Sequence, residues 1–350
     1  MKYQPLNILS IGAGAIGTYI GGSLALEGHK VVFLERPEIA KQLRQNAVQL
    51  ELVTGLHTID NPLIAESIED ALDMGPYDAA LFALKSFDTK NALNAFSKYA
   101  DRLPPFLCLQ NGVDNEREIA EALGADKVIY GTVTSAIGRR GPGNIVLKRL
   151  RGMGVAGGHP LSERLTAALD HAGLNAVLYP RPEDMKWSKM LTNLLANASA
   201  AILDMTPGEV FAAPALYRLE IQQLRETLAV MGAQNIGLTN LPGTPVKALG
   251  FAARYLPAAM SQPLLKKAVG KGRGNKMPSF HIDLYGGRGK SEVDFLNGAV
   301  SRAGKLLGIP TPINDLFNVT LQKITSGEIP LEEFRRQPEK LTAAAKSFTA

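Results

Sequence analysis

Short apolar runs alternate with amphipathic segments over the first half of the chain. The apolar runs have the length and composition of buried strands and cover residues 6–11, 30–34, 77–84 and 106–110. The amphipathic segments have helical spacing and cover residues 18–28, 37–46, 88–99 and 116–123. A short strand pair is expected around residues 48–59. Because strands alternate with helices of this length, we predict a parallel sheet with helices on both faces.

The pattern changes after residue 127. Residues 128–137, 143–149 and 153–156 have the pattern of consecutive strands, with a turn from Gly138 to Gly143 between the first two. This predicts an antiparallel extension at one end of the sheet. A helix over residues 161–172 and a strand over 176–179 complete this part of the chain. The segment Pro180-Arg181-Pro182 then marks the expected domain boundary.

From residue 183 onward the pattern is helical. Long amphipathic helices are expected over residues 183–202, 215–231, 291–307 and 311–326. Ser291 and Asp294 have the spacing of a capping box that opens the third of these helices. Over residues 238–280, short helices are expected between glycines, prolines and basic residues, and the tail over residues 343–350 is expected to fray.

The first apolar run ends in a Gly-x-Gly-x-x-Gly turn, Gly12-Ala13-Gly14-Ala15-Ile16-Gly17. Gly12 permits the tight turn, Gly14 lets the backbone approach a pyrophosphate, and Gly17 lets the new helix pack against the strand. A strand precedes the turn, and a helix and a second strand follow it, which is the context that this motif needs. We therefore predict a dinucleotide site here. The competing interpretation is a glycine-rich turn without a ligand.

At 350 residues the chain has the length of two domains. We predict an α/β fold, with a Rossmann-type doubly wound sheet and its antiparallel extension over residues 1–180 and an all-helical domain over 181–350. Hydrophobic residues make up 45% of the chain and charged residues 20%, as in ordinary soluble proteins. We see no secretory signal and no run of eighteen apolar residues for a membrane span. The single cysteine, Cys108, lies in an apolar run and agrees with a reducing cytoplasm.

The net charge of +5 is modest and does not by itself indicate a nucleic-acid partner. The densest basic segment is interrupted by glycines and has no aromatic residues for base stacking. It contains Lys266, Lys267, Lys271, Arg273 and Lys276. We interpret it as a solvated loop. The sequence also gives no reason to expect a metal site.

Glu35 and Arg36 end the second predicted strand. An acidic side chain at this place hydrogen-bonds the adenosine ribose of NAD, whereas a nearby arginine neutralises the 2′-phosphate of NADP. The chain offers both, so the residues alone leave the choice of coenzyme open.

Polar residues also follow the next two predicted strands. Lys85 comes directly after the strand over 77–84, and Asn111 follows the strand over 106–110. Ligands bind at the carboxyl ends of strands in open α/β sheets, so both side chains are candidates for such a site. A solvated lysine and an Asn-Gly turn are the competing interpretations.

Lys189, Asn193 and Asn197 stand at i, i+4 and i+8 of the first predicted helix of the second half. They form one polar stripe on a helix that is otherwise largely apolar. Asparagine is a poor helix former, so two of them beside an ammonium favour a water-poor polar site over a solvated face. Ser279 and Glu292 stand near helix starts, where a cap or a first-turn acid is the simpler interpretation.

With these residues assembled, the chain resembles the ketopantoate reductase (2-dehydropantoate 2-reductase) family over nearly its whole length, apart from residues 238–278. Shared motifs in the first half are the glycine turn, Leu84-Lys85-Ser86, Gln110-Asn111-Gly112 and the segment from Gly131 to Gly143. In the second half they are Trp187-x-Lys189-x-x-x-Asn193-x-x-x-Asn197 and Ser291-Glu292-Val293-Asp294 continuing to Gly298.

The resemblance implies NADPH-dependent reduction of ketopantoate to pantoate, a coenzyme A precursor, with Lys189 as the general acid. Asn193 and Asn197 would bind substrate, and Ser279 would hold its carboxylate. Glu292 would contact the substrate hydroxyl and the cofactor, while Lys85 and Asn111 would line the nicotinamide side. Arg36 would bind the 2′-phosphate of NADP, and NAD remains an alternative coenzyme because of Glu35. A homodimer formed through the helical domain is also expected.

The chain departs from the family in residues 238–278, which are longer than in compact members. This segment would either cover the site as a lid or mark a different 2-keto acid. The alternatives to ketopantoate are therefore another branched or aromatic 2-keto acid, or a non-catalytic NADP-binding protein.

Overall fold

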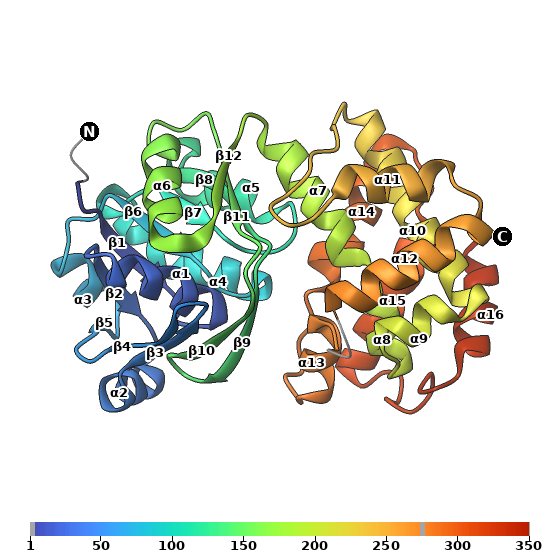
Figure 1. The fold of residues 1–350 in the computed structure, drawn as a ribbon, viewed down its shortest axis with the longest axis horizontal. Helices are drawn as coiled ribbons and strands as arrows, with labels where there is room; N and C mark the ends of the chain where they lie inside the picture. Colours follow the sequence, from blue (N-terminus) through green and yellow to red (C-terminus); the bar gives the residue numbers. More distant parts are fainter. Residues whose placement is uncertain (1–3, 274–276, 350) are drawn as a thin grey trace. The chain divides into compact units, whose positions relative to one another are not determined.

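The computed structural model describes residues 4–273 and 277–349, with the side chains of 268–273 and 349 left out. The chain divides into two compact units (Figure 1). The first unit runs up to Lys186 and also contains Leu241–Thr244. The second unit contains Trp187–Asn240 and the residues from Pro245 on.

The first unit is built on an eight-stranded sheet in the order β12-β11-β8-β7-β6-β1-β2-β5. Its strands are β1 (Asn7–Ile11), β2 (Lys30–Leu34), β5 (Leu63–Ala65), β6 (Ala79–Phe82), β7 (Phe106–Cys108), β8 (Val128–Val133), β11 (Met153–Ala156) and β12 (Ala176–Tyr179). From β5 to β8 all neighbours are parallel. The strand order reverses next to β1, as in a doubly wound fold, so this prediction is confirmed.

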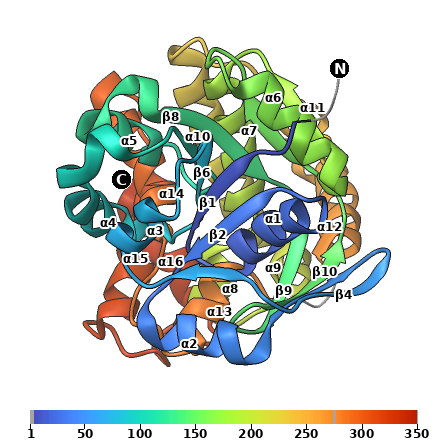
Figure 2. The ribbon, with the colours of Figure 1, turned by 90° about the vertical axis from the view of Figure 1, so that its left-hand side faces the viewer.

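The predicted antiparallel extension is only partly correct. β11 does pair antiparallel with β8, but the hairpin of β9 (Ala136–Gly141) and β10 (Asn144–Arg149) leaves the main sheet. It forms a second sheet with β3 (Val48–Leu52) and β4 (Gly55–Ile59), in the order β4-β3-β10-β9. Figure 2 labels β4, β9 and β10 of this sheet. The strand predicted over residues 128–137 is divided because the N–H groups of Thr134 and Ser135 both donate to the Gly152 carbonyl, at 3.0 and 3.1 Å. That local arrangement ends β8.

Apolar cores lie on both faces of the main sheet. Alternate residues of β1 belong to different clusters, with Ile8 in one and Leu9 in the other, because successive side chains of a strand point to opposite faces. The cluster with Ile8 includes residues of α1 (Ala15–Leu26) and α6 (Ser162–Leu169). The cluster with Leu9 includes residues of α3 (Ile68–Asp73), α4 (Thr89–Phe96) and α5 (Asn115–Leu123). The prediction of helices on both faces is therefore confirmed.

The second unit is helical, as predicted. Its helices are α7 (Pro182–Leu194, which begins in the first unit), α8 (Ala198–Leu203), α9 (Pro207–Ala212), α10 (Pro214–Ala233), α11 (Val246–Tyr255), α12 (Ala258–Arg273), α13 (Ser279–Tyr285), α14 (Val293–Leu307), α15 (Pro312–Ser326) and α16 (Pro338–Thr349). The frayed tail is a wrong prediction, because α16 buries Leu341 and Ala345. Among the described residues, no helix combines the length and the apolar content that a bilayer crossing requires.

Candidate functional site

The glycine turn joins β1 to α1, and its first and last glycines are required by the fold. Gly12 has a φ of +92°, and its N–H donates to the Leu34 carbonyl of β2 at 3.1 Å. A Cβ added at Gly17 would lie 1.8 Å from the Gly12 carbonyl oxygen, so only glycine allows this approach of helix and turn. Gly14 is different, since a Cβ added there would meet no atom within 4 Å. The protein's own packing therefore does not explain Gly14.

The turn presents the N-terminus of α1, with Gly14 as the cap and Ala15 and Ile16 as the first helical residues. The first turn carries no acidic side chain that would neutralise the partial positive charge of the helix end. Thr18 braces the turn by donating its Oγ1 hydrogen to the Ala13 carbonyl at 2.9 Å. An open glycine at such a helix end fits the pyrophosphate of a dinucleotide.

Glu35 reaches back from the end of β2 to the glycine turn. Its Oε1 accepts a hydrogen bond from the Ala13 N–H at 2.7 Å, and its Oε2 accepts one from the Arg36 N–H at 3.2 Å. Arg36 caps the N-terminus of α2 (Pro37–Asn46) and is exposed. The carboxylate is therefore held against the turn by two backbone groups, whereas Arg36 is exposed.

The loops that carry Lys85 and Asn111 are tied together by buried side chains. Lys85 stands before the short helix Ser86–Asp88 that follows β6, and Asn111 follows β7. The Asn111 carbonyl accepts hydrogen bonds from Ser86 Oγ at 3.0 Å and from Asn115 Nδ2 at 2.7 Å. Because β6 and β7 are neighbours, the structure brings these two predicted loops to the same edge of the sheet.

Sequence reasoning missed a buried ion pair beside Asn111. Lys186 in α7 and Glu116 in α5 are 3% and 0% exposed, and Lys186 Nζ lies 2.6 Å from Glu116 Oε1. Burial lowers the pKa of Lys186, but the Glu116 carboxylate raises it, and the net shift is upward. The only sequence signal is a lysine between Met185 and Trp187, since a charge in an apolar helical turn is unusual.

The predicted continuous helix over residues 183–202 is wrong, because α7 ends at Leu194 and α8 begins at Ala198. Ala196 has a φ of +46°, which turns the chain between the two helices. Glu220 of α10 holds this break by accepting hydrogen bonds from the Ala196 N–H at 2.7 Å and from Ser199 Oγ at 2.6 Å. Asn197 therefore caps α8 and does not continue a stripe with Lys189 and Asn193.

The break brings two predicted substrate residues into contact. Asn197 is buried, and its Nδ2 lies 3.4 Å from Ser279 Oγ at the start of α13. Its Oδ1 accepts a hydrogen bond from the Phe280 N–H at 3.2 Å. Two segments 82 residues apart thus meet at one amide side chain.

The remaining predicted residues of this unit lie on α7 and before α14. Lys189 and Asn193 are half-buried and one helical turn apart on α7. Glu292 is 2% exposed and caps α14. The predicted capping box is wrong, because Ser291 Oγ accepts from the Val293 N–H at 3.2 Å, while the Asp294 carboxylate binds Arg302 at 2.9 Å.

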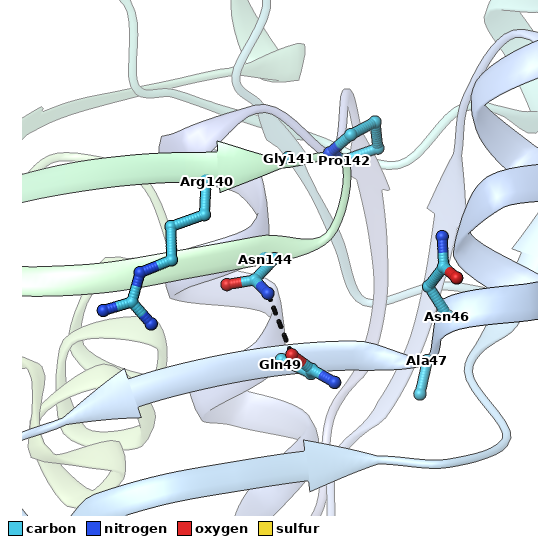
Figure 3. A pocket seen from close by; sticks show the side chains of 7 residues that line it. All are labelled: Asn46, Ala47, Gln49, Arg140, Gly141, Pro142 and Asn144. Carbon is cyan, nitrogen blue, oxygen red and sulfur yellow. Dashed lines mark hydrogen bonds between the residues drawn. The ribbon is translucent and has the colours of Figure 1, made fainter.

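A pocket of about 320 Å³ lies elsewhere in the first unit (Figure 3). It is lined by the C-terminal end of α2 and by the β9–β10 turn, and in it Asn144 Nδ2 donates to Gln49 Oε1 at 2.8 Å. Arg36 caps the opposite end of α2, which at ten residues is about 15 Å long. The pocket contains none of the predicted site residues.

The basic segment was predicted to be a loop, which is wrong for its first part, because residues up to Arg273 belong to α12. Lys266 and Lys267 are exposed on that helix, so their predicted contact with solvent is confirmed. Lys276 and the side chains of Lys271 and Arg273 lie outside the described part of the chain.

Comparison with known proteins matches both units to one family. Residues 8–157 match the family model "Ketopantoate reductase PanE/ApbA", and residues 183–324 match the model of its C-terminal part. A 2-dehydropantoate 2-reductase of Pyrococcus horikoshii is 27% identical over 89% of this chain and 95% of its own. One of Halobacterium salinarum is 25% identical over 88% and 95%.

Solved structures agree. A PanE/ApbA family ketopantoate reductase from Ralstonia eutropha JMP134 is 25% identical, with a TM-score of 0.76 over 92% of this chain and 99% of its own. A D-mandelate dehydrogenase solved with NADH and anilino(oxo)acetate is 20% identical, with a TM-score of 0.74 over 91% and 98%, and shares the fold. The family models thus match both units of the structure, and this chain belongs to the ketopantoate reductase family.

Proposed function

We propose that this protein reduces ketopantoate to pantoate with a reduced nicotinamide coenzyme. The observation that carries the proposal is the contact of Asn197 with Ser279, because it joins two residues that the family resemblance assigns to the substrate. The curated relatives at 25–27% identity carry the name 2-dehydropantoate 2-reductase. Pantoate formation places the protein in the supply of coenzyme A precursors. The single buried Cys108 is compatible with a reducing compartment such as the cytoplasm.

Each unit supplies part of the proposed chemistry. In the first, the turn from Gly12 to Gly17 holds the pyrophosphate, and Lys85 and Asn111 line the nicotinamide side. In the second, Asn193 and Asn197 bind the substrate, Ser279 binds its carboxylate, and Glu292 contacts its hydroxyl and the coenzyme. The coenzyme, when bound, supplies the hydride that adds to the keto carbon.

Lys189 is proposed as the general acid. Negative charge grows on the keto oxygen as the hydride arrives, so an ammonium beside that oxygen stabilises the transition state more than the ground state. Lys189 then gives its proton to the oxygen, which yields the hydroxyl of the product. General acid catalysis of this kind contributes about 10²- to 10⁴-fold in rate.

The family resemblance implies NADPH, through Arg36, with NAD left open by Glu35. We propose instead that NADH is preferred over NADPH. Glu35 supports this, because its carboxylate is fixed on the Ala13 N–H, beside the turn that would hold the pyrophosphate. A ribose diol can donate hydrogen bonds to it, whereas the negative charge of a 2′-phosphate beside it would be repelled. Arg36 is exposed and must be ordered to offset that repulsion.

The coenzyme proposal is tested by titrating the protein with NADH and with NADPH and following the fluorescence of the reduced nicotinamide. Wild type is expected to bind NADH more tightly. Glu35→Gln is expected to reduce the difference in affinity between NADH and NADPH, because it should improve NADPH binding. Arg36→Gln is expected to increase this difference in affinity. Tighter binding of NADPH by wild type would overturn the preference.

The reaction is tested by following coenzyme oxidation with ketopantoate beside a panel of branched and aromatic 2-keto acids. Ketopantoate is expected to give the highest kcat/KM. The D-mandelate dehydrogenase neighbour makes an aromatic 2-keto acid the second candidate. A preference for such a substrate by orders of magnitude would replace ketopantoate, and coenzyme binding without any turnover would support a non-catalytic binder.

We also propose that the protein is a homodimer formed through its helical unit. Phe251 and Tyr255 of α11 and Met260 and Leu264 of α12 are all more than half exposed. The rings of Phe251 and Tyr255 lie 5.3 Å apart, and a contiguous exposed apolar patch marks an association surface. Light scattering of the wild type should give twice the chain mass, and Phe251→Glu with Leu264→Glu should give a monomer. A wild-type monomer at micromolar concentration would contradict the proposal.

A further inference from the structure

Lys186 is a buried cation that the proposed reaction does not use. It is 3% exposed, and its counter-ion, Glu116, is fully buried. Taking two charges out of water is costly, and an apolar pair of similar volume is often equally or more stable. The ion pair is therefore poorly explained by stability alone, and its contacts indicate what else it does.

The Lys186 ammonium has three oxygen atoms around it. Besides Glu116 Oε1 at 2.6 Å, it donates to the Gln110 carbonyl at 2.8 Å and to the Gly131 carbonyl at 3.3 Å. The contact with Glu116 is an ion pair, and the two carbonyls are the hydrogen-bond acceptors. The side chain thus connects α7 to α5, to β8 and to the loop that follows β7.

The loop after β7 is held from two sides at consecutive residues. The carbonyl of Gln110 is held by Lys186, and that of Asn111 by Ser86 and Asn115. Gln110 is further fixed by its own Nε2, which donates to Thr89 Oγ1 at 2.8 Å. The peptide that carries the Asn111 side chain therefore has little freedom to rotate.

We propose that Lys186 is a positioning residue for the reaction, holding the Gln110–Asn111 peptide in the orientation that presents Asn111 to the coenzyme. This inference rests on the proposed function. Lys186 is the last residue of the first unit, and α7 continues from it to Lys189 one turn later. The charge of Glu116 holds the ammonium in place, so both members of the pair are required.

The test compares a variant that removes the hydrogen bond from Lys186 to the Gln110 carbonyl with a variant that only destabilises the fold. Lys186→Met leaves a carboxylate buried without its counter-ion and is expected to fold poorly. The double variant Lys186→Met/Glu116→Leu replaces both charges by apolar groups and is expected to fold. Leu50→Ala is the control, because it opens a cavity in the same unit but on β3, remote in sequence from this loop.

Three measurements are made on each folded variant: kcat with ketopantoate, coenzyme affinity by fluorescence, and hydrogen–deuterium exchange of peptides over residues 109–116. The double variant should lose roughly 10- to 100-fold in kcat, bind coenzyme more weakly and exchange faster in this segment. Leu50→Ala should melt at a lower temperature than wild type. Its kcat, its coenzyme affinity and its exchange over residues 109–116 should equal those of wild type.

The outcomes separate this inference from the proposed function. A double variant with wild-type kcat, coenzyme affinity and exchange would show that the pair only fills space, and the inference would be wrong. If the wild type reduces no 2-keto acid, the proposed function fails instead, while exchange and coenzyme affinity still report whether Lys186 holds the loop.

Discussion

At the scale of single residues, two glycines of one turn have opposite surroundings. A methyl group at Gly17 would overlap the Gly12 carbonyl, whereas one at Gly14 would meet nothing within 4 Å. Gly14→Ala should therefore fold with nearly wild-type stability and lose affinity for the coenzyme, because the methyl group blocks the approach of the pyrophosphate.

Gly17→Ala, in contrast, should lower the melting temperature, because the added methyl group would overlap the Gly12 carbonyl oxygen. Thermal melting and fluorescence titration of both variants check the pair. Equal melting temperatures for the two would contradict this account of the turn.

Lys189 provides a second test at this scale. Lys189→Ala should lower kcat by about 10²- to 10⁴-fold, since it removes both the proton donor and the cation. Affinity for the coenzyme should remain, because the glycine turn and Glu35 are unchanged. Lys148→Ala, which removes an exposed lysine of β10, is the matched control. Unchanged turnover in Lys189→Ala would exclude it as the acid.

At the scale of elements, the break between α7 and α8 depends on Glu220. Glu220→Gln replaces one carboxylate oxygen by an amide nitrogen, so either the Ala196 N–H or Ser199 Oγ loses its acceptor. A buried donor without an acceptor costs about 1–3 kcal/mol. We expect a lower free energy of unfolding and, because Asn197 follows directly, a higher KM for ketopantoate. Arg218→Gln, on the exposed side of α10, should change neither.

The start of α9 gives a pH-dependent prediction. Hydrogen bonds from Thr206 and the Arg336 guanidinium lower the pKa of Glu209 to about 2. A lowered carboxyl pKa stabilises the fold above the unfolded value of 4.5, and the contribution is lost as the pH falls toward 2. Solvent reduces its size, because the side chain is 42% exposed.

The difference in melting temperature between wild type and Glu209→Gln should therefore shrink as the pH falls from about 6 to 3. The exposed Glu332→Gln should show no such trend. A difference that is constant over this range would argue that Glu209 is not held as its contacts indicate.

The sequence predicted where helices and strands lie better than it predicted which distant strands and side chains they contact. Apolar periodicity located the parallel strands β1, β2, β6 and β7 but missed β5, which has only three residues. The glycine spacing located the turn, because it depends on nearby residues. The helix break was not predictable, since it is held by Glu220, 24 residues away in α10. The second sheet was missed for the same reason: β10 pairs with β3, and Asn144 lies 95 residues from Gln49.

In the candidate site, too, features that depend on nearby residues were predicted and contacts between distant residues were not. The glycine turn, Glu35, Asn197 and Ser279 were named from spacing and resemblance, and the structure adds the contacts of the last two. Lys186 and Glu116 were missed, because a lysine in a helix is normally solvated and nothing in the sequence shows that it faces a carboxylate.

At the scale of the whole molecule, the second sheet fixes the order in which the first unit can be completed. β3 is made early in the chain, but its partner β10 is made almost one hundred residues later. A nascent chain or a fragment ending before residue 128 would therefore present the backbone groups of β3 and β7 as open edges, and open edges invite strands from other chains. Shortened versions meant to keep only the glycine turn should aggregate, and the smallest soluble fragment should extend at least through β12.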